Sequence, residues 1–360
     1  NILMNNLDFK KVLKNIKKSK KNSVKLEFNI FNNFIYGNNR IKSKKKYTYY
    51  ETIKKLVDIE NNLQKNPNST MDNYLYATAL YNLSYWGNSN ILTTSYRSTY
   101  YFKEKANELK KINLSIKHFK KALKTAKNKE FKAKIIYMLA KSELALYDIN
   151  SAKTVNYDFT KGYALKRAFY WDHQKVYNNF IVKGYGEYFN KLKQKYSDTS
   201  YYKQLLKECG NLNYYYKTSN TLDKLNKNIK NHKNKIALLK DIENDVKNKK
   251  TKELKEYNQL YIYTLLKDIP LTKKTLAYYN NIAYYLIMKR KNYEAIYLLE
   301  KIINKYPKRV VALYNLGDAY YSNYNYDKAR EYYKKYIELM KKLNKENKIP
   351  KKVLLRVQSR

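Results

Sequence analysis

The stretch ALYNLGDAYYSNYNYDKAREYYKKYIEL, from Ala312 to Leu339, decides the predicted fold. It carries small side chains at Gly317, Ala319 and Ala329, with tyrosines between them. The spacing of its apolar residues predicts two helices. Helices approach closely only where a bulky side chain is missing from the crossing, so the stretch predicts a tightly packed helical hairpin.

The same pattern occurs 34 residues earlier in the chain. Ala283 corresponds to Gly317, and Ala295 corresponds to Ala329. A hairpin of this kind cannot bury its apolar face alone, so neighbouring copies must stack on it. We therefore predict two repeats over residues 271–342, in which these four small residues are the repeat-packing positions.

This pattern resembles the tetratricopeptide repeat (TPR) family over about residues 276–339, with LYNLGDAYY as its core string. Upstream, the strings ALYNLSYWG, HFKKALKTAK and YFNKLKQKYSDT look like degenerate halves of such repeats. The string SDTSYYKQLLKECG is loosely similar to uncharacterised exported proteins of Bacteroidetes type. The resemblance implies an all-α, helix-hairpin α-solenoid that is irregular in its N-terminal half. The looser similarity favours the cell envelope over the cytoplasm.

In the resembling family, extended peptides or partner helices bind a concave groove lined by the first helix of each repeat. The resemblance implies these groove residues here: Asn280, Asn281, Tyr284, Ile287, Met288, Tyr314, Asn315, Asp318, Tyr321 and Ser322. Asn281 and Asn315 occupy the position where an asparagine often bonds a peptide backbone. The basic pair that clamps a C-terminal carboxylate in chaperone-binding members is not recognisable in this sequence.

Outside the two repeats, the spacing of apolar residues and the distribution of charge divide the chain into four further segments. We predict a basic, partly irregular segment at 1–46, a degenerate helical-repeat region with insertions at 47–218, a long polar helix or linker at 219–270, and a basic tail at 343–360. Gly210 is predicted to end a helix. In the first segment Phe9, Val12 and Ile16 share one helical face, which packs on a neighbour or lies on a membrane or nucleic acid.

The chain carries a large positive net charge, but this charge alone does not identify a function. Formal net charge is +45, from 75 basic and 30 acidic residues, and only eight of the basic residues are arginines. Lys, Asn, Ile and Tyr are encoded by AT-rich codons. A shift of the genome toward A and T therefore explains this composition as simply as a function does. Such a surface still attracts polyanions in a salt-dependent way. Non-specific nucleic-acid binding is therefore an alternative function.

No set of residues in the sequence has the spacing of a catalytic or metal site. His118, His173 and His232 are scattered, Cys209 is the single cysteine, and no Gly-Lys-Ser/Thr phosphate loop occurs. We interpret the triplet Trp171-Asp172-His173 as a surface loop. The string NYYYK could stack on bases, but helical spacing places most of the 43 tyrosines in the core.

The sequence therefore predicts a non-enzymatic helical-repeat scaffold that binds a protein or peptide partner, with no cofactor and no metal. No run of about 18 apolar residues occurs, so we also expect no transmembrane segment. The sequence begins with Asn1 rather than Met, and we expect it to be a fragment or a processed form.

Overall fold

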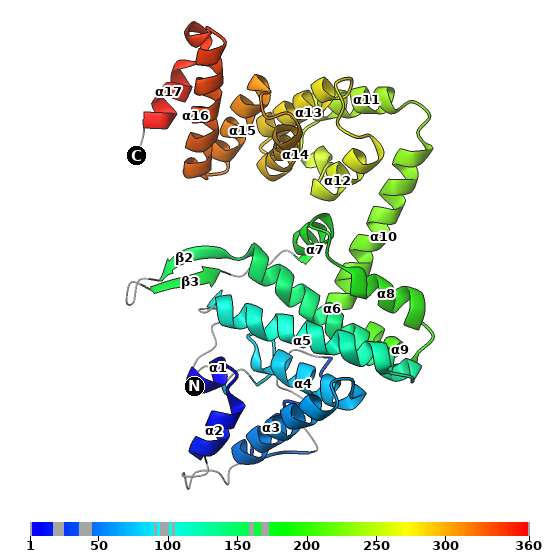
Figure 1. Cartoon of the computed structure of the whole chain (residues 1–360). Coiled ribbons are helices and arrows are strands. Elements are labelled where there is room, and N and C mark those ends of the chain that lie inside the picture. Colours follow the sequence, from blue (N-terminus) through cyan, green and yellow to red (C-terminus); the bar gives the residue numbers. More distant parts are fainter. Residues whose placement is uncertain are drawn as a thin grey trace. The chain divides into compact units, whose positions relative to one another are not determined.

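The computed structural model describes residues 2–16, 25–35, 45–89, 92–93, 101–102, 105–157, 162–166 and 173–358. The chain divides into two compact units, Asn1–Thr218 and Ser219–Arg360 (Figure 1). Helices account for most of the described residues in both units. The predicted all-α helical-repeat fold is therefore confirmed as the fold class.

The first unit is built from helices that pack in succession along the chain. They are α1 (Ile2–Asn5), α2 (Phe9–Ile16), α3 (Tyr49–Lys65), α4 (Thr70–Leu83), α5 (Lys105–Thr125), α6 (Lys129–Ser151), α7 (His173–Val182), α8 (Glu187–Tyr196) and α9 (Ser200–Glu208). The main pairs are α4 with α5 and α6 with α8, and α5 packs on α6 to join them. Residues 84–104 and 152–186 are thus insertions between two paired helices, which explains why the 34-residue period is lost there.

A small antiparallel sheet lies within these insertions and departs from the all-α prediction. Its strands are β1 (Tyr101–Phe102), β2 (Lys153–Tyr157) and β3 (Gly162–Lys166), in the order β1-β3-β2. Lys153 pairs with Lys166 and Tyr157 with Gly162, so β2 and β3 form a hairpin (Figure 1). The sequence predicts a degenerate helical-repeat region with insertions over residues 47–218, and it gives no signal for strands within those insertions.

The apolar face of the N-terminal segment is buried inside the first unit. Phe9, Val12 and Ile16 of α2 join a core cluster with Ile53 and Leu56 of α3. The neighbour-packing interpretation therefore applies, and this face is closed to a membrane or a nucleic acid. Thr48 begins α3 with a capping box, because its hydroxyl accepts from the Glu51 N–H while the Glu51 carboxylate accepts from the Thr48 N–H.

The second unit begins within α10 and continues to the end of the chain. Its elements are α10 (Gly210–Asn231), α11 (Lys235–Asn248), η2 (Thr251–Leu254), α12 (Gln259–Asp268), α13 (Leu276–Met288), α14 (Asn292–Lys305), α15 (Val310–Ser322), α16 (Tyr326–Lys342), η3 (Glu346–Lys348) and α17 (Lys351–Gln358). The predicted long polar segment at 219–270 is not one helix, because Asn234 caps a new helix by accepting from the N–H groups of Ile236 and Ala237. The predicted helix end at Gly210 is confirmed, since α9 ends at Glu208 with Cys209 as its C-cap residue. Gly210 is also the first residue of α10.

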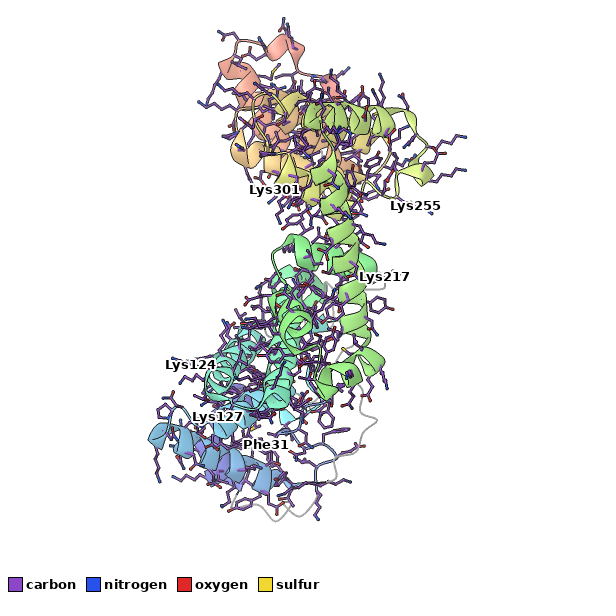
Figure 2. All side chains as sticks on the ribbon, turned by 90° about the vertical axis from the view of Figure 1, so that its right-hand side faces the viewer. Phe31, Lys124, Lys127, Lys217, Lys255 and Lys301 are labelled. Atoms are coloured by element: carbon purple, nitrogen blue, oxygen red, sulfur yellow. The ribbon has the colours of Figure 1, made fainter. Side chains whose placement is uncertain are left out.

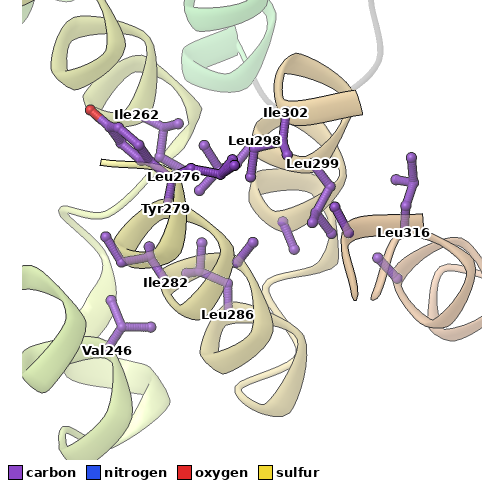
Figure 3. Close-up of a cluster of buried hydrophobic side chains, with 14 of the residues drawn as sticks. Val246, Ile262, Leu276, Tyr279, Ile282, Leu286, Leu298, Leu299, Ile302 and Leu316 are labelled. Carbon is purple, nitrogen blue, oxygen red and sulfur yellow. The ribbon is translucent and has the colours of Figure 1, made fainter. Parts of the chain in front are cut away.

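Helices α13 to α16 form the two predicted hairpins, and the helices before them extend the same packing. α13 packs on α14, α14 on α15, and α15 on α16, while α11 packs on α13 and α12 on α14. Figure 3 shows the shared core, with the side chains of Ile282, Leu298 and Leu316 buried between these helices. Tyr279 closes one edge by donating its hydroxyl to the backbone carbonyls of Ile269 and Leu265.

The small residues lie at the tightest points of this core. Ala283, Ala295 and Ala329 are buried. A Cβ on Gly317 would come within 2.4 Å of the Tyr333 ring, which is itself fully buried on α16. Contact at that distance is impossible without movement, so the ring of Tyr333 requires a glycine on α15.

The turn between the two helices of each repeat uses a left-handed backbone. Arg290 and Tyr324 both have φ of 59°, and they are 34 residues apart. Glycine and asparagine are the usual residues in this conformation, because a side chain costs about 1 kcal/mol there. The repeat geometry thus holds two bulky residues in an unfavourable backbone state.

Candidate partner-binding surface

The first helices of the two repeats, α13 and α15, carry the predicted groove residues in contrasting environments. On α13, Tyr284 and Met288 are 44% and 64% exposed, whereas Asn280 is buried. On α15, Asn315 is buried, and the side chains of Tyr314, Asp318 and Tyr321 are only partly exposed. Ile287 is half-buried and Ser322 is exposed. The structure therefore leaves α13 as the more open of the two helices.

The two asparagines predicted to bond a peptide backbone differ in what surrounds them. Asn281 is exposed, and its amide donates to the Glu243 carboxylate of α11 at 3.1 Å. Asn315 is 3% exposed and belongs to the interior of its repeat. Next to Asn281, the buried Asn280 has a side-chain oxygen without a hydrogen-bond partner in the part of the chain that the structure describes. An unpaired buried acceptor costs about 1–3 kcal/mol.

The second repeat is engaged by the chain's own C-terminal helix. The predicted basic tail, 343–360, contains α17, which packs against α16 and buries Val353 completely. Arg356 donates to the Asp318 carboxylate and to the Tyr333 hydroxyl, both at 2.7 Å, while Lys352 donates to the other Asp318 oxygen at 3.0 Å. The acidic member of the predicted groove therefore already has two cationic partners.

Aromatic rings complete the contact with α17. The Arg356 guanidinium carbon lies 3.8 Å from the centre of the Tyr321 ring, and the Lys352 ammonium lies 5.0 Å from that of Tyr314. Both distances fall within the range of cation–π attraction. Tyr314, Asp318 and Tyr321 thus face two basic side chains of the same molecule.

Electrostatics strengthen this arrangement. Burial, together with the hydrogen bond to Asp318, raises the pKa of Tyr333 well above its usual value, so the hydroxyl stays protonated and donates to Asp318 at 2.6 Å. Burial alone would lower the pKa of Lys352, but hydrogen bonds to Tyr314 and Asp318 outweigh it and hold that pKa above its usual value. Around neutral pH, Asp318 therefore receives hydrogen bonds from two cations and a phenol, the charge-assisted kind that are the strongest.

Sequence reasoning missed α17 and the residues that it brings to the site. The string KKVLLRVQ, residues 351–358, does carry the necessary signal. Lys352 and Arg356 are four residues apart, as are Val353 and Val357, so one helical face is basic and the adjoining face is apolar. Because the segment is strongly basic, it was interpreted as a charged tail rather than as an amphipathic helix.

The residues considered for catalysis have structural surroundings where the structure describes them. The ring of His118 is hydrogen-bonded through Nδ1 to the Asn73 side chain at 2.7 Å and meets the Tyr76 ring edge-on. Cys209 is buried against the Tyr137 hydroxyl. Trp171 and Asp172 lie outside the described residues, and nothing is described of the His173 side chain. Among the described residues, no group of three or more His, Cys, Asp or Glu side chains could hold a metal ion.

Comparison with protein families identifies the second repeat. A family model described as tetratricopeptide repeat matches residues 310–343, which hold α15 and α16. The chain therefore contains a tetratricopeptide repeat. This match confirms the resemblance on which the predicted all-α repeat fold was based. The similarity to exported Bacteroidetes proteins stays a prediction.

Comparison with whole proteins adds less than the family model does. One solved structure that matches the chain is the TPR domain of P58(IPK), at 15% identity and a TM-score of 0.21, covering 85% of this chain and 94% of that one. No curated protein matches the sequence. None of the helices among the described residues is long and apolar enough to cross a membrane.

Proposed function

We propose that this protein is a non-enzymatic scaffold that binds a protein or peptide partner through the exposed side of α13. Tetratricopeptide repeats generally act as interaction modules rather than as catalysts. The observation that carries the proposal is the exposure of Tyr284 and Met288, two large side chains on a helix whose other apolar residues are mostly buried. Tyrosine and methionine are enriched in the cores of protein interfaces.

The partner binds to an aromatic and thioether surface. The Tyr284 ring packs edge-on to the half-buried Tyr285 ring at 5.3 Å, which holds it in place. Methionine adapts its shape to different apolar partners. A peptide or helix with apolar side chains at helical spacing fits such a surface.

The test compares the full chain with two full-length double variants. Tyr284→Ala plus Met288→Ala removes the proposed surface, and Met71→Ala plus Leu206→Ala is the matched control, since those side chains are 53% and 38% exposed in the first unit. Tagged proteins are used to capture and quantify partners from an extract of the source cells. We expect partners of the wild type to be lost only with the first variant. Equal recovery with both variants overturns the proposal.

A third arm separates α13 from the second repeat. Tyr314→Ala plus Tyr321→Ala alters the surface that contacts α17. If partner recovery falls with this variant and not with Tyr284→Ala plus Met288→Ala, the binding surface lies on α15 and the proposal for α13 is wrong.

Polyanion binding is the alternative function, and the net charge of +45 favours it. Lysines such as Lys124, Lys217 and Lys255 are exposed on both units (Figure 2). Base stacking by the NYYYK string has less support, because Tyr215 and Tyr216 are buried. The test is binding of a single-stranded oligonucleotide from about 50 to 200 mM salt, where purely electrostatic attraction falls steeply. Affinity that survives the higher salt would favour this alternative.

A further inference from the structure

The contact between α17 and the second repeat has the composition of a ligand-recognition site. Asp318 uses both carboxylate oxygens to accept from cations that are four residues apart on one helix. Rings of Tyr314 and Tyr321 lie beneath those cations. The site therefore selects one chemistry, a helix with basic residues at i and i+4.

The acceptor side of this contact is built into the core of the repeat. Tyr333 is fully buried, its ring fills the space left by Gly317, and its hydroxyl donates to Asp318 at 2.6 Å. The orientation of Asp318 is thus fixed by a residue that belongs to the packed core. A carboxylate held in this way is ready for a cation before any helix arrives.

The donor side, by contrast, is weakly attached. α17 has eight residues, and a helix of that length is marginal in water unless it packs on something. Of its side chains Val353 alone is fully buried, while Leu354 and Leu355 are 43% and 56% exposed. Residues 341–348, which lead to it, are exposed throughout. Segments with so few buried contacts open at a lower free energy than the rest of a protein.

We propose that Tyr314, Asp318 and Tyr321 form a recognition site for a basic amphipathic helix of a partner protein, and that α17 is its intramolecular occupant. This inference rests on the proposed scaffold function and adds a second, gated site to the surface on α13. A partner segment with cations four residues apart replaces α17, and its apparent affinity is reduced by the fraction of time that α17 occupies the site.

The test uses a fluorescent synthetic peptide of residues 349–358 and the full-length protein. Fluorescence anisotropy measures its binding to three proteins: the wild type, Lys352→Ala plus Arg356→Ala, and the same pair combined with Asp318→Asn. A peptide of identical composition in scrambled order is the control. Because the protein and the peptide are both positively charged, simple electrostatics opposes their association.

We expect the double variant to bind the peptide at least tenfold more tightly than the wild type, because its own α17 no longer competes. Adding Asp318→Asn should reverse that gain, and the scrambled peptide should not bind. Equal affinity of the wild type and the double variant overturns the proposal. A wild-type dimer that dissociates when Lys352 and Arg356 are replaced also overturns it, since α17 would then occupy a second copy.

A measurement on the unaltered protein covers the case in which a variant misfolds. Hydrogen exchange of the wild type is followed with and without excess peptide. Amides of α17 should exchange faster when the peptide is present, while those of α16 stay protected. Unchanged α17 exchange at saturating peptide contradicts the proposal. The proposed function is tested separately at Tyr284 and Met288, so either can fail while the other stands.

Discussion

The pentapeptide ALYNL occurs in both units, at residues 79–83 and at 312–316, and leads to different structures. In the second unit α15 continues past it to Ser322, and Gly317 lets the Tyr333 ring of α16 approach. In the first unit α4 ends at Leu83, and the next helix of the pair begins only at Lys105. The same apolar spacing therefore builds a compact hairpin in one unit and an interrupted one in the other.

Polar contacts hold the interrupted pair together. The buried Glu108 of α5 accepts from the N–H of Tyr85 at 2.7 Å, just beyond the end of α4. Lys111 donates to Glu108 at 2.7 Å and to the Leu83 carbonyl at 3.4 Å. These bonds satisfy backbone groups that a continuing helix would have paired. The first unit thus uses a buried ion pair where the second uses a small residue.

The largest effect is expected from breaking that ion pair. Glu108→Ala leaves Lys111 buried and fully hidden from solvent, and removing one partner of a buried pair costs about 3–5 kcal/mol. Both tryptophans of the chain, Trp86 and Trp171, are in the first unit, so tryptophan fluorescence during urea unfolding reports its stability. Lys54→Ala is the control, because its pair with Asp58 is more than half exposed. Equal midpoints for the two variants would falsify this account of the first unit.

The second largest effect concerns the crossing in the second unit. Gly317→Ala places a Cβ against the Tyr333 ring, and overpacking of this kind costs about 1–3 kcal/mol. Gly210→Ala is a matched control, since its Cβ would meet nothing closer than 4.0 Å. It should be neutral or stabilising by up to about 1 kcal/mol, because alanine favours helix.

Calorimetry can resolve the transition of the second unit for Gly317→Ala and that of the first unit, which holds Gly210, for Gly210→Ala. Ala329→Leu, at another buried small residue, should be destabilised by about as much as Gly317→Ala, again about 1–3 kcal/mol. If Gly317→Ala and Ala329→Leu melt with the wild type, small residues do not determine the hairpin.

The third effect is a pH dependence confined to the first unit. Burial, followed by the nearby Lys121 and Lys117 charges, lowers the pKa of His118 from 6.5 to about 4. The folded state therefore favours the neutral ring. As pH falls from 6.5 to 4, the unfolded chain takes up a proton that the folded chain does not, and stability decreases.

The expected loss from His118 is about 1–2 kcal/mol, because the ring is partly exposed and solvent screens it. Fluorescence-detected unfolding of the wild type and of His118→Gln, between pH 7 and 4, measures it. The difference between the two free energies of unfolding should change over this range. A constant difference contradicts the assigned shift.

The repeat period predicted the second unit well, for a physical reason. Residues spaced by 34 predict helices α13 to α16. The spacing is informative because each small residue packs against a large side chain, such as Tyr333, where the two helices of a repeat cross. The single helix α17 has no second copy 34 residues away, so its only signal is the spacing of basic and apolar residues within KKVLLRVQ. α17 is held by Asp318, a residue distant in sequence, and α11 begins because Asn234 caps it. In the first unit the insertions obscure the period, so the α4–α5 pair was not predictable by spacing.

A smaller, stabilising effect is expected at the turn of the second repeat. Tyr324 has φ of 59° and is 82% exposed, so its side chain contributes little to packing. Tyr324→Gly removes the cost of the left-handed backbone, about 1 kcal/mol, and part of that gain is lost to the greater freedom of unfolded glycine. We expect a net stabilisation of about 0.5 kcal/mol, seen as a higher melting temperature of the second unit. A decrease would show that the tyrosine side chain supports the turn.

The smallest effect tests whether the lysine-rich surface supports the fold at all. Lys328 is next to the packing residue Ala329, and its ammonium lies 5.0 Å from the Tyr320 ring and 3.9 Å from the Glu300 carboxylate. Both the lysine and the glutamate are partly exposed, so solvent screens the pair, and Lys328→Ala should cost no more than about 0.5 kcal/mol. Its melting temperature should thus match that of the wild type, while Ala329→Leu, one residue away, melts lower. A loss of more than about 1 kcal/mol for Lys328→Ala, beyond what an exposed cation–π contact supplies, would show that lysines stacked on tyrosines are part of the fold.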